Sequence, residues 1–317
     1  MTNRQARGVT AVLVHGGFLG PWIWANTVEL LEARGVRPVT VDLPSSQDGG
    51  DRLADLHDDA ERVRDALNGC TDVVLCGHSY AGAVISEAAA GPHRAVRHLV
   101  FLAAAVPDAG DSLASLAETA AKNNPAGAQE ESDGEEIEMR ADGRMVMRPQ
   151  SARAALFHDC PPDRADTAIA LLRRQTPATG TQPVTVAPWR DIPSTYVRCS
   201  QDRLPYELVS PAYWEHASHV LTLPTGHCPQ WSRPDLVAEL LWSVISSAWP
   251  QPIQLPSRRD HSHQDNAARR EISGCEERDR SAALARSGSR APCRRGVAAD
   301  HLDSGGDPRP DDHGETG

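Results

Sequence analysis

The stretch Leu75–Val84 reads LCGHSYAGAV, and its first two residues end the apolar run Asp72–Cys76. The apolar run predicts a buried strand, and the small residues from Ala81 onward predict a helix. The chain must therefore turn sharply within Gly77–Tyr80. Strand and helix come close together at such a turn, so its flanking positions need small residues. Gly77 and Ala81 supply them, and we expect Ser79 to sit at the strained tip.

Ser79 has two interpretations. In the first it is the nucleophile of a G-x-S-x-G turn, which exposes the serine hydroxyl above a sheet. Ala81 stands where that pattern has its last glycine, and Gly82 follows one place later. A single methyl group still meets the demand for a small residue. In the second interpretation Ser79 only caps the helix. The helix N-terminus would in either case offer free N–H groups and partial positive charge to an anion.

Alternating strand and helix patterns extend from this turn in both directions. Apolar runs predict further strands at Thr10–Val14, Pro38–Val41, His98–Ala103, Thr195–Cys199 and, more weakly, His219–Leu223. Helical periodicity predicts helices over Trp24–Arg34, Arg52–Leu67, Ala81–Ala90 and Pro234–Trp249. Such alternation is typical of an α/β fold with a mostly parallel central sheet and helices on both faces.

The alternation stops between residues 108 and 188, which are polar and rich in helical patterns. A hairpin is predicted on the two sides of Ala141–Gly143, because the flanking residues alternate and the turn ends in glycine. We interpret 108–188 as a cap inserted into a core formed by 1–107 and 189–250.

Composition excludes several classes of function. From Gln251 onward there is no Phe, Trp or Tyr, so we expect 251–317 to be a disordered, low-complexity tail. The formal net charge of −11 argues against a nucleic-acid partner. No apolar run is long enough to span a membrane, and the N-terminal one is too short for a signal peptide. Seven cysteines without CxxC spacing favour a cytoplasmic protein with reduced thiols.

A serine nucleophile needs an imidazole base and an acid that orients it, in the chain order Ser, Asp or Glu, His. His227 follows the last predicted strand and precedes the Pro234 helix. Asp202 follows the preceding strand, and we favour it as the acid over Asp108, which follows the His98–Ala103 strand. All these residues lie at the carboxyl ends of strands, where open α/β sheets place their sites.

The glycine-rich loop after the first strand reads VLVHGGFLGPWIW from Val12 to Trp24. Backbone N–H groups of Gly17 and Tyr80 would form the oxyanion hole of a serine hydrolase. A phosphate cradle is disfavoured, because neither G-x-G-x-x-G nor a P-loop lysine is present. We expect an apolar substrate pocket, for which the candidates are Phe18, Trp22, Trp24, Leu156 and Phe157. Packing of the tryptophans onto the first helix remains an equal alternative.

These motifs together resemble the α/β-hydrolase superfamily, and within it the branch of plant methylesterases, hydroxynitrile lyases and bacterial esterase relatives. The resemblance spans Thr10 to Trp249 and rests on VLVHGGFLGPWIW, VTVDLP, LCGHSYAGAV, LVFLAAAVPD, YVRCSQDRLP and TGHCPQWSRPDLVAELL. It implies Ser79 as nucleophile, His227 as base, Asp202 as acid, Gly17 and Tyr80 as oxyanion donors, a cap over the pocket, and neither cofactor nor metal.

The implied activity is hydrolysis of a small or medium carboxylic ester through an acyl-enzyme. Two positions depart from the branch: Leu19 stands where members often have histidine, and Cys228 stands where the lyases have lysine. The missing lysine disfavours cyanohydrin cleavage. The alternatives left open are another lyase or a cyclisation catalyst, for example in polyketide tailoring, and a non-catalytic small-molecule receptor.

Overall fold

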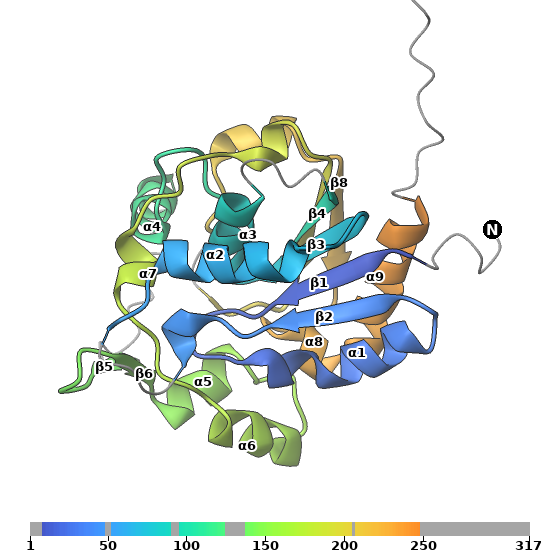
Figure 1. Cartoon of the computed structure of the whole chain (residues 1–317). Coiled ribbons are helices and arrows are strands. Elements are labelled where there is room, and N and C mark those ends of the chain that lie inside the picture. The colour runs from blue at the N-terminus through green and yellow to red at the C-terminus, as the bar shows by residue number, and fades with distance from the viewer. Residues whose placement is uncertain (1–7, 48–51, 90–94, 124–136, 205–206, 248–317) are drawn as a thin grey trace, which may run out of the picture. The chain divides into compact units, whose positions relative to one another are not determined.

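Six parallel strands form the central sheet of the computed structural model (Figure 1). The model describes residues 8–47, 52–89, 95–123, 137–204 and 207–247. These residues belong to one unit of the chain, Met1–Pro252. The tail 251–317, for which the sequence predicts disorder, lies outside the described residues.

The strands of the sheet run in the order β2-β1-β3-β4-β7-β8. Their bounds are β1 Thr10–Val14, β2 Arg37–Val41, β3 Val73–His78, β4 Val96–Leu102, β7 Ser194–Cys199 and β8 His219–Leu223. Every neighbouring pair is parallel. All six strands predicted from apolar runs are confirmed, with small shifts at their ends. The carboxyl ends of all six therefore meet at one edge of the sheet.

Two apolar cores lie on opposite faces of this sheet, because successive side chains of a strand point in opposite directions. On β1, Ala11 and Leu13 belong to one core, whereas Val12 and Val14 belong to the other. Both faces are covered over the central strands β1 and β3, so these strands are buried along their whole length and are largely apolar rather than alternating with polar residues. This is why short continuous apolar runs were the correct signal for strands.

Helices cover both faces of the sheet (Figure 1). The core that contains Leu13 is closed by α1 Ala25–Glu32 and α9 Pro234–Ser247, together with the short α8 Pro229–Ser232 and the 3-10 turn Pro21–Trp24. The other core is closed by α2 Leu56–Leu67 and α3 Ala81–Ala88. Asp55 begins α2 with a capping box, in which its side chain accepts the N–H of Asp58 while the Asp58 side chain accepts that of Asp55.

The chain leaves the sheet after β4 and rejoins it at β7. Between them lie α4 Leu113–Asn123, the antiparallel hairpin of β5 Ile137–Met139 and β6 Met145–Met147, α5 Pro149–Ala155, α6 Pro162–Ala170 and α7 Ala178–Thr181. The hairpin turns at Gly143, whose φ of +78° favours glycine. The division of the chain into core and cap at residues 108 and 188 stays a prediction. No helix among the described residues is long and apolar enough to cross a membrane.

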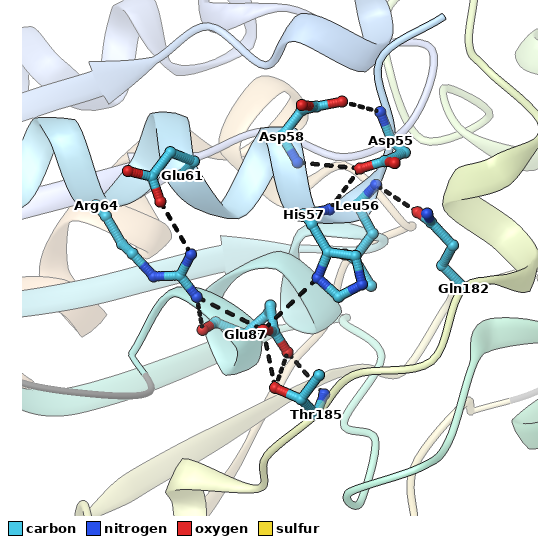
Figure 2. A network of polar contacts seen from close by, with 9 residues as sticks. All are labelled: Asp55, Leu56, His57, Asp58, Glu61, Arg64, Glu87, Gln182 and Thr185. Carbon is cyan, nitrogen blue, oxygen red and sulfur yellow. Dashed lines mark hydrogen bonds and ion pairs between the residues drawn. The ribbon is translucent and has the colours of Figure 1, made fainter.

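The end of this insertion is anchored to the helices α2 and α3 by a network of polar contacts (Figure 2). Gln182 accepts the backbone N–H of Leu56 at 2.8 Å, at the start of α2. The Glu87 carboxylate on α3 accepts both the N–H of Thr185, at 2.7 Å, and its hydroxyl. Nη2 of Arg64, on α2, lies 3.5 Å from Oε1 of Glu87. The segment that leads back to β7 is thereby tied to both helices.

Two glycines allow the turn around Ser79 to pack. A Cβ on Gly77 would lie 2.6 Å from the carbonyl oxygen of Ala81, at the start of α3. A Cβ on Gly82 would lie only 1.9 Å from the carbonyl oxygen of Ala105, in the chain that follows β4. Glycine is therefore required at position 82, because the chain that follows β4 lies too close for a side chain. The methyl group of Ala81, in contrast, fits into the packing and is fully buried.

We expect Gly82→Ala to destabilise the fold severely, by about 3 kcal/mol or more, because backbone must move to admit the methyl group. Thermal unfolding should then begin roughly 10 °C lower than in the wild type. Ala81→Gly is the matched control and should cost no more than about 1 kcal/mol. Equal melting temperatures for Gly82→Ala and the wild type would contradict the packing described here.

A buried histidine, His98 on β4, should make stability depend on pH. Its Nε2 lies 2.8 Å from the hydroxyl of Thr195 on β7, and burial lowers its pKa to about 4. The native state excludes a proton that the unfolded chain binds below about pH 6.5, so stability falls as pH drops from 6.5 towards 4.

Urea denaturation at pH 7.5 and at pH 5.0 measures this effect. We expect His98→Gln to lose less stability between the two pH values than the wild type does, by up to about 2 kcal/mol. The comparison isolates His98 from the other titrating groups. An identical pH dependence in the two proteins would show that His98 is not the cause.

Candidate active site

Ser79 lies on a strained turn between β3 and α3. Its φ is +56°, in the left-handed region that side chains other than glycine rarely adopt. Its N–H donates to the carbonyl of Leu102 at 3.2 Å, and its carbonyl accepts the N–H of Ala105 at 3.0 Å. The end of β4 therefore holds the backbone of Ser79 from both sides and maintains the strained conformation. The hydroxyl is left to project above the sheet.

A hydrogen-bonded chain of three side chains begins at this hydroxyl. Nε2 of His227 lies 2.9 Å from Ser79 Oγ, and Nδ1 of His227 lies 2.7 Å from a carboxylate oxygen of Asp202. Ser79 follows β3, Asp202 follows β7 and His227 follows β8. Burial raises the pKa of Asp202, but its hydrogen bond with His227 and the charge of that residue lower it more, so the pKa lies below its ordinary value. Asp202 is thus ionised near neutral pH.

Asp108, the rival acid, does not contact His227. Its carboxylate accepts hydrogen bonds from the Arg190 guanidinium, from Nη2 and, at 3.3 Å, from Nε. It is also absent from the residues that line the cavity described below. The side chain is committed to a salt bridge at the base of the insertion.

Two neighbouring residues of the insertion hold the loops that carry the acid and the base. His158 Nε2 lies 2.9 Å from the carbonyl of Gln201, directly before Asp202. Asp159 accepts the backbone N–H of Gly226, directly before His227, at 2.7 Å and the hydroxyl of Ser232 at 2.7 Å. A Cβ on Gly226 would meet both side chains at less than 3 Å. Nothing in the sequence pattern between α5 and α6 indicates this contact.

His78, beside the serine, is a buried neutral histidine. Burial lowers its pKa to about 3, so it carries no proton on its second nitrogen at neutral pH. Nε2 of His78 lies 2.8 Å from the carbonyl of His227, and the two rings are 4.9 Å apart between centroids. With the proton on Nε2, His78 donates to this carbonyl and fixes the main chain of His227.

Backbone N–H groups that could bind an anion flank Ser79. Gly17, after β1, and Tyr80, before α3, both line the cavity. In the described part of the chain, no hydrogen bond engages the N–H of either residue. The next residue in the loop, Phe18, has a φ of +61° and thus a second strained backbone beside the site. Unpaired N–H groups at a cavity wall are costly unless a ligand accepts from them.

The side chain of Tyr80 leads away from the cavity to a buried carboxylate. Its hydroxyl donates to Asp59 at 2.8 Å, and Ser45 donates to the same carboxylate from its N–H, at 2.9 Å, and from its hydroxyl. Burial raises the pKa of Asp59 to about 6 although these bonds lower it. Asp59 could have been noticed in the sequence, because it lies on the apolar face of α2 next to Ala60.

A cavity of about 460 Å³ opens above Ser79. The loops after β1, β3, β4, β7 and β8 all contribute to its lining, as open α/β sheets predict. The insertion adds an apolar wall. The apolar residues that line the cavity include Phe18, Leu19, Leu113, Met147, Leu156 and Leu208. This volume is typical of a small-molecule site.

Of the five residues expected in the pocket, Phe18 and Leu156 line the cavity and the other three do not. Trp24 and Phe157 are fully buried in the core on the α1 face. Trp22 packs edge-on against Trp231 of α8, with 5.2 Å between ring centroids. The 3-10 turn Pro21–Trp24 thus places Trp22 against α8 and Trp24 in the core, and neither lines the pocket.

Metal ligands do not gather in the part of the chain that the structure describes. It holds no group of three or more His, Cys, Asp and Glu side chains placed to bind an ion. Among the cavity-lining residues, His227 and Asp202 are hydrogen-bonded to each other.

Comparison with known proteins identifies the family of the chain. The model of the alpha/beta hydrolase family matches residues 11–240. The chain is 30% identical over 254 residues to alpha/beta hydrolase nvfD of Aspergillus novofumigatus, which covers 75% of this chain and 96% of that protein. It is 35% identical over 108 residues to polyneuridine aldehyde esterase of Rauvolfia serpentina, covering 32% of this chain and 41% of the esterase.

A solved structure shares the fold. The pyrethroid hydrolase from Sphingobium faniae superposes with a TM-score of 0.60 at 23% identity, over 75% of this chain and 98% of that one. The shared fold is the sheet of parallel strands with its covering helices. The chain belongs to the alpha/beta hydrolase family, among relatives that include plant methylesterases and bacterial esterases.

Proposed function

We propose that this protein is a serine esterase that hydrolyses a small or medium carboxylic ester through an acyl-enzyme. The hydrogen-bonded chain of Asp202, His227 and Ser79, which ends at the floor of an apolar cavity, carries the proposal. A serine hydroxyl is a weak nucleophile at neutral pH and needs an imidazole at this distance. The esterase relatives support the same reaction class.

Acylation would use each of these groups in turn. His227 takes the hydroxyl proton as Ser79 Oγ attacks the ester carbonyl, and Asp202 stabilises the imidazolium and holds its ring. The N–H groups of Gly17 and Tyr80 donate to the oxyanion that forms. Collapse of the tetrahedral intermediate expels the alcohol, which receives the proton from His227. The acyl group is then bound to Ser79.

Deacylation repeats the steps with water in place of serine. His227 accepts a proton from the water molecule that attacks the acyl carbonyl, and the same N–H groups stabilise the second oxyanion. The carboxylic acid leaves and Ser79 regains its proton. No residue beyond those already placed at the cavity is needed.

The cavity supports an uncharged, largely apolar substrate. Side chains from the insertion and from the loop after β1 make its wall apolar, and its volume suits a molecule of moderate size. Arg198 lines the cavity, and its guanidinium donates from Nε and Nη2 to the two carboxylate oxygens of Glu207. A substrate carboxylate would have to displace this partner.

The residue after the base argues against cyanohydrin cleavage. Cys228 is fully buried, and burial raises the pKa of its thiol, so this position supplies no positive charge for a leaving cyanide. Two alternatives remain: a lyase or cyclisation catalyst of another kind, and a non-catalytic receptor. An isotope-labelling experiment distinguishes them from the esterase. Hydrolysis in ¹⁸O-labelled water should place one label in the acid product, whereas a lyase releases no labelled acid.

Ser79→Ala should lower kcat for a p-nitrophenyl ester by at least ~10⁴-fold, because the nucleophile is lost. His227→Ala should have a similar effect, and Asp202→Asn a fall of roughly 10³-fold or more. Ser86→Ala, which removes a buried hydroxyl from α3, the helix that follows Ser79, is the matched control and should keep wild-type rates. A fluorophosphonate should label the wild type at Ser79. Turnover or labelling that survives in Ser79→Ala would refute the assignment.

Acyl-chain preference should depend on Leu156, which lines the cavity from the insertion. Leu156→Ala enlarges this wall, so we expect kcat/KM for p-nitrophenyl octanoate, relative to the acetate, to rise about 10-fold or more. Leu171→Ala, at a half-exposed leucine of the same insertion, should leave this ratio unchanged. A ratio that is the same in both variants would place the acyl group elsewhere.

A further inference from the structure

A buried chain of hydrogen bonds joins the two loops that flank Ser79. The N–H of Phe18 donates to Oε1 of Gln175 at 3.2 Å, and Nε2 of Gln175 donates to the hydroxyl of Ser45 at 2.8 Å. Ser45 donates to the carboxylate of Asp59, and the Tyr80 hydroxyl donates to the same oxygen at 2.8 Å. The chain thus runs from the loop after β1 to the residue that follows Ser79.

Burial makes these bonds obligatory. Ser45 and Asp59 are fully buried, and Gln175 and Tyr80 are only 3% and 6% exposed. Water cannot replace a lost partner at such depth, so the loss of one bond leaves a polar group unsatisfied. The network is therefore a rigid connection between segments that are far apart in the sequence.

Each end of the network lies at one of the two unpaired N–H groups. At one end is Phe18, the residue after Gly17, whose N–H is unpaired. At the other end is the hydroxyl of Tyr80, whose own backbone N–H is unpaired. A Cβ on Gly17 would lie 3.8 Å from Oε1 of Gln175 and 3.9 Å from Cβ of Tyr80. Gln175 and Tyr80 thus both lie next to Gly17.

The strained backbone of Phe18 depends on the same segment. Its N–H is bound by Gln175, and its carbonyl accepts the N–H of Arg173 at 2.8 Å. Both backbone groups of Phe18 are therefore held by Arg173–Gln175, from the insertion. A positive φ at a non-glycine residue persists only where the surroundings enforce it. Without this segment the loop after β1 would relax, and the N–H of Gly17 would change direction.

We infer that Gln175 is a positioning residue for the oxyanion hole. The hydrogen bond between Asp59 and the Tyr80 hydroxyl holds the other side of the hole in place. The inference rests on the proposed esterase function. Gln175 touches no reacting atom. It sets the direction of the Gly17 N–H through Phe18 and is braced, through Ser45, by the carboxylate that holds Tyr80. The insertion thereby supplies part of the oxyanion geometry as well as the pocket wall.

Kinetics and a transition-state analogue test this inference. Gln175→Leu removes, at similar volume, the three side-chain hydrogen bonds of Gln175 with Phe18, Ser45 and Thr179. Tyr80→Phe removes one hydroxyl and keeps the backbone N–H. Each should lower kcat for a p-nitrophenyl ester by about 10- to 100-fold while KM changes less than about threefold, since a misdirected donor weakens only the oxyanion.

A trifluoromethyl ketone should discriminate further. Ser79 Oγ adds to its carbonyl carbon and the hydroxyl proton passes to His227, which leaves a hemiketal oxyanion in the hole. Its Ki should rise by the same factor as kcat falls, whereas Ki for the methyl ketone of equal length, which stays largely unreacted, should not change. Gln182→Leu is the matched control, because Gln182 accepts a backbone N–H of α2 away from the cavity, and it should alter neither constant.

The outcomes are separable. The inference would be overturned if Gln175→Leu and Tyr80→Phe both kept the kcat and the trifluoromethyl ketone affinity of the wild type. The proposed esterase function would still stand in that case, provided that Ser79→Ala abolishes turnover. A wild type without esterase turnover would refute the proposed function itself. Thermal unfolding of each variant identifies one that fails to fold, and Tyr80→Phe, which loses a single oxygen atom, then decides the result.

Discussion

The backbone of Ser79 is held at a φ of +56° by hydrogen bonds to the end of β4 on both of its sides. This strained residue requires that β3, α3 and the chain after β4 approach more closely than side chains allow. Gly77 and Gly82 make that approach possible. The rest of the site follows from the same contact, because the hydroxyl can project above the sheet only while the turn is kept tight.

Parallel strands explain how distant residues meet above that hydroxyl. Every strand ends at the same edge of the sheet, so the loops after β1, β3, β7 and β8 bring Gly17, Ser79, Asp202 and His227 to one place. The sheet does not fix their orientation. Buried polar contacts do so instead, and several come from the insertion between β4 and β7, which therefore supports the site as well as covering it.

Much of this arrangement was predictable from sequence, since strands buried on both faces are continuous apolar runs and the glycines around Ser79 mark a close approach. Asp202 was preferred to Asp108 because of its place after a particular strand, and the structure brings Asp202 alone of the two to His227. The buried Asp59 was visible as an acid on an apolar helix face but was not singled out.

Local sequence patterns are enough to predict the elements, their order and the strand ends at which polar residues stand, because periodicity and turn residues are local properties. Other features depend on how the chain packs in three dimensions: Trp22 lies against α8, Trp24 is buried in the core, and Gln175, His158 and Asp159 reach the loops of the site. These contacts join residues from separate parts of the chain. Their geometry depends on how the insertion packs against the sheet, which no local pattern encodes.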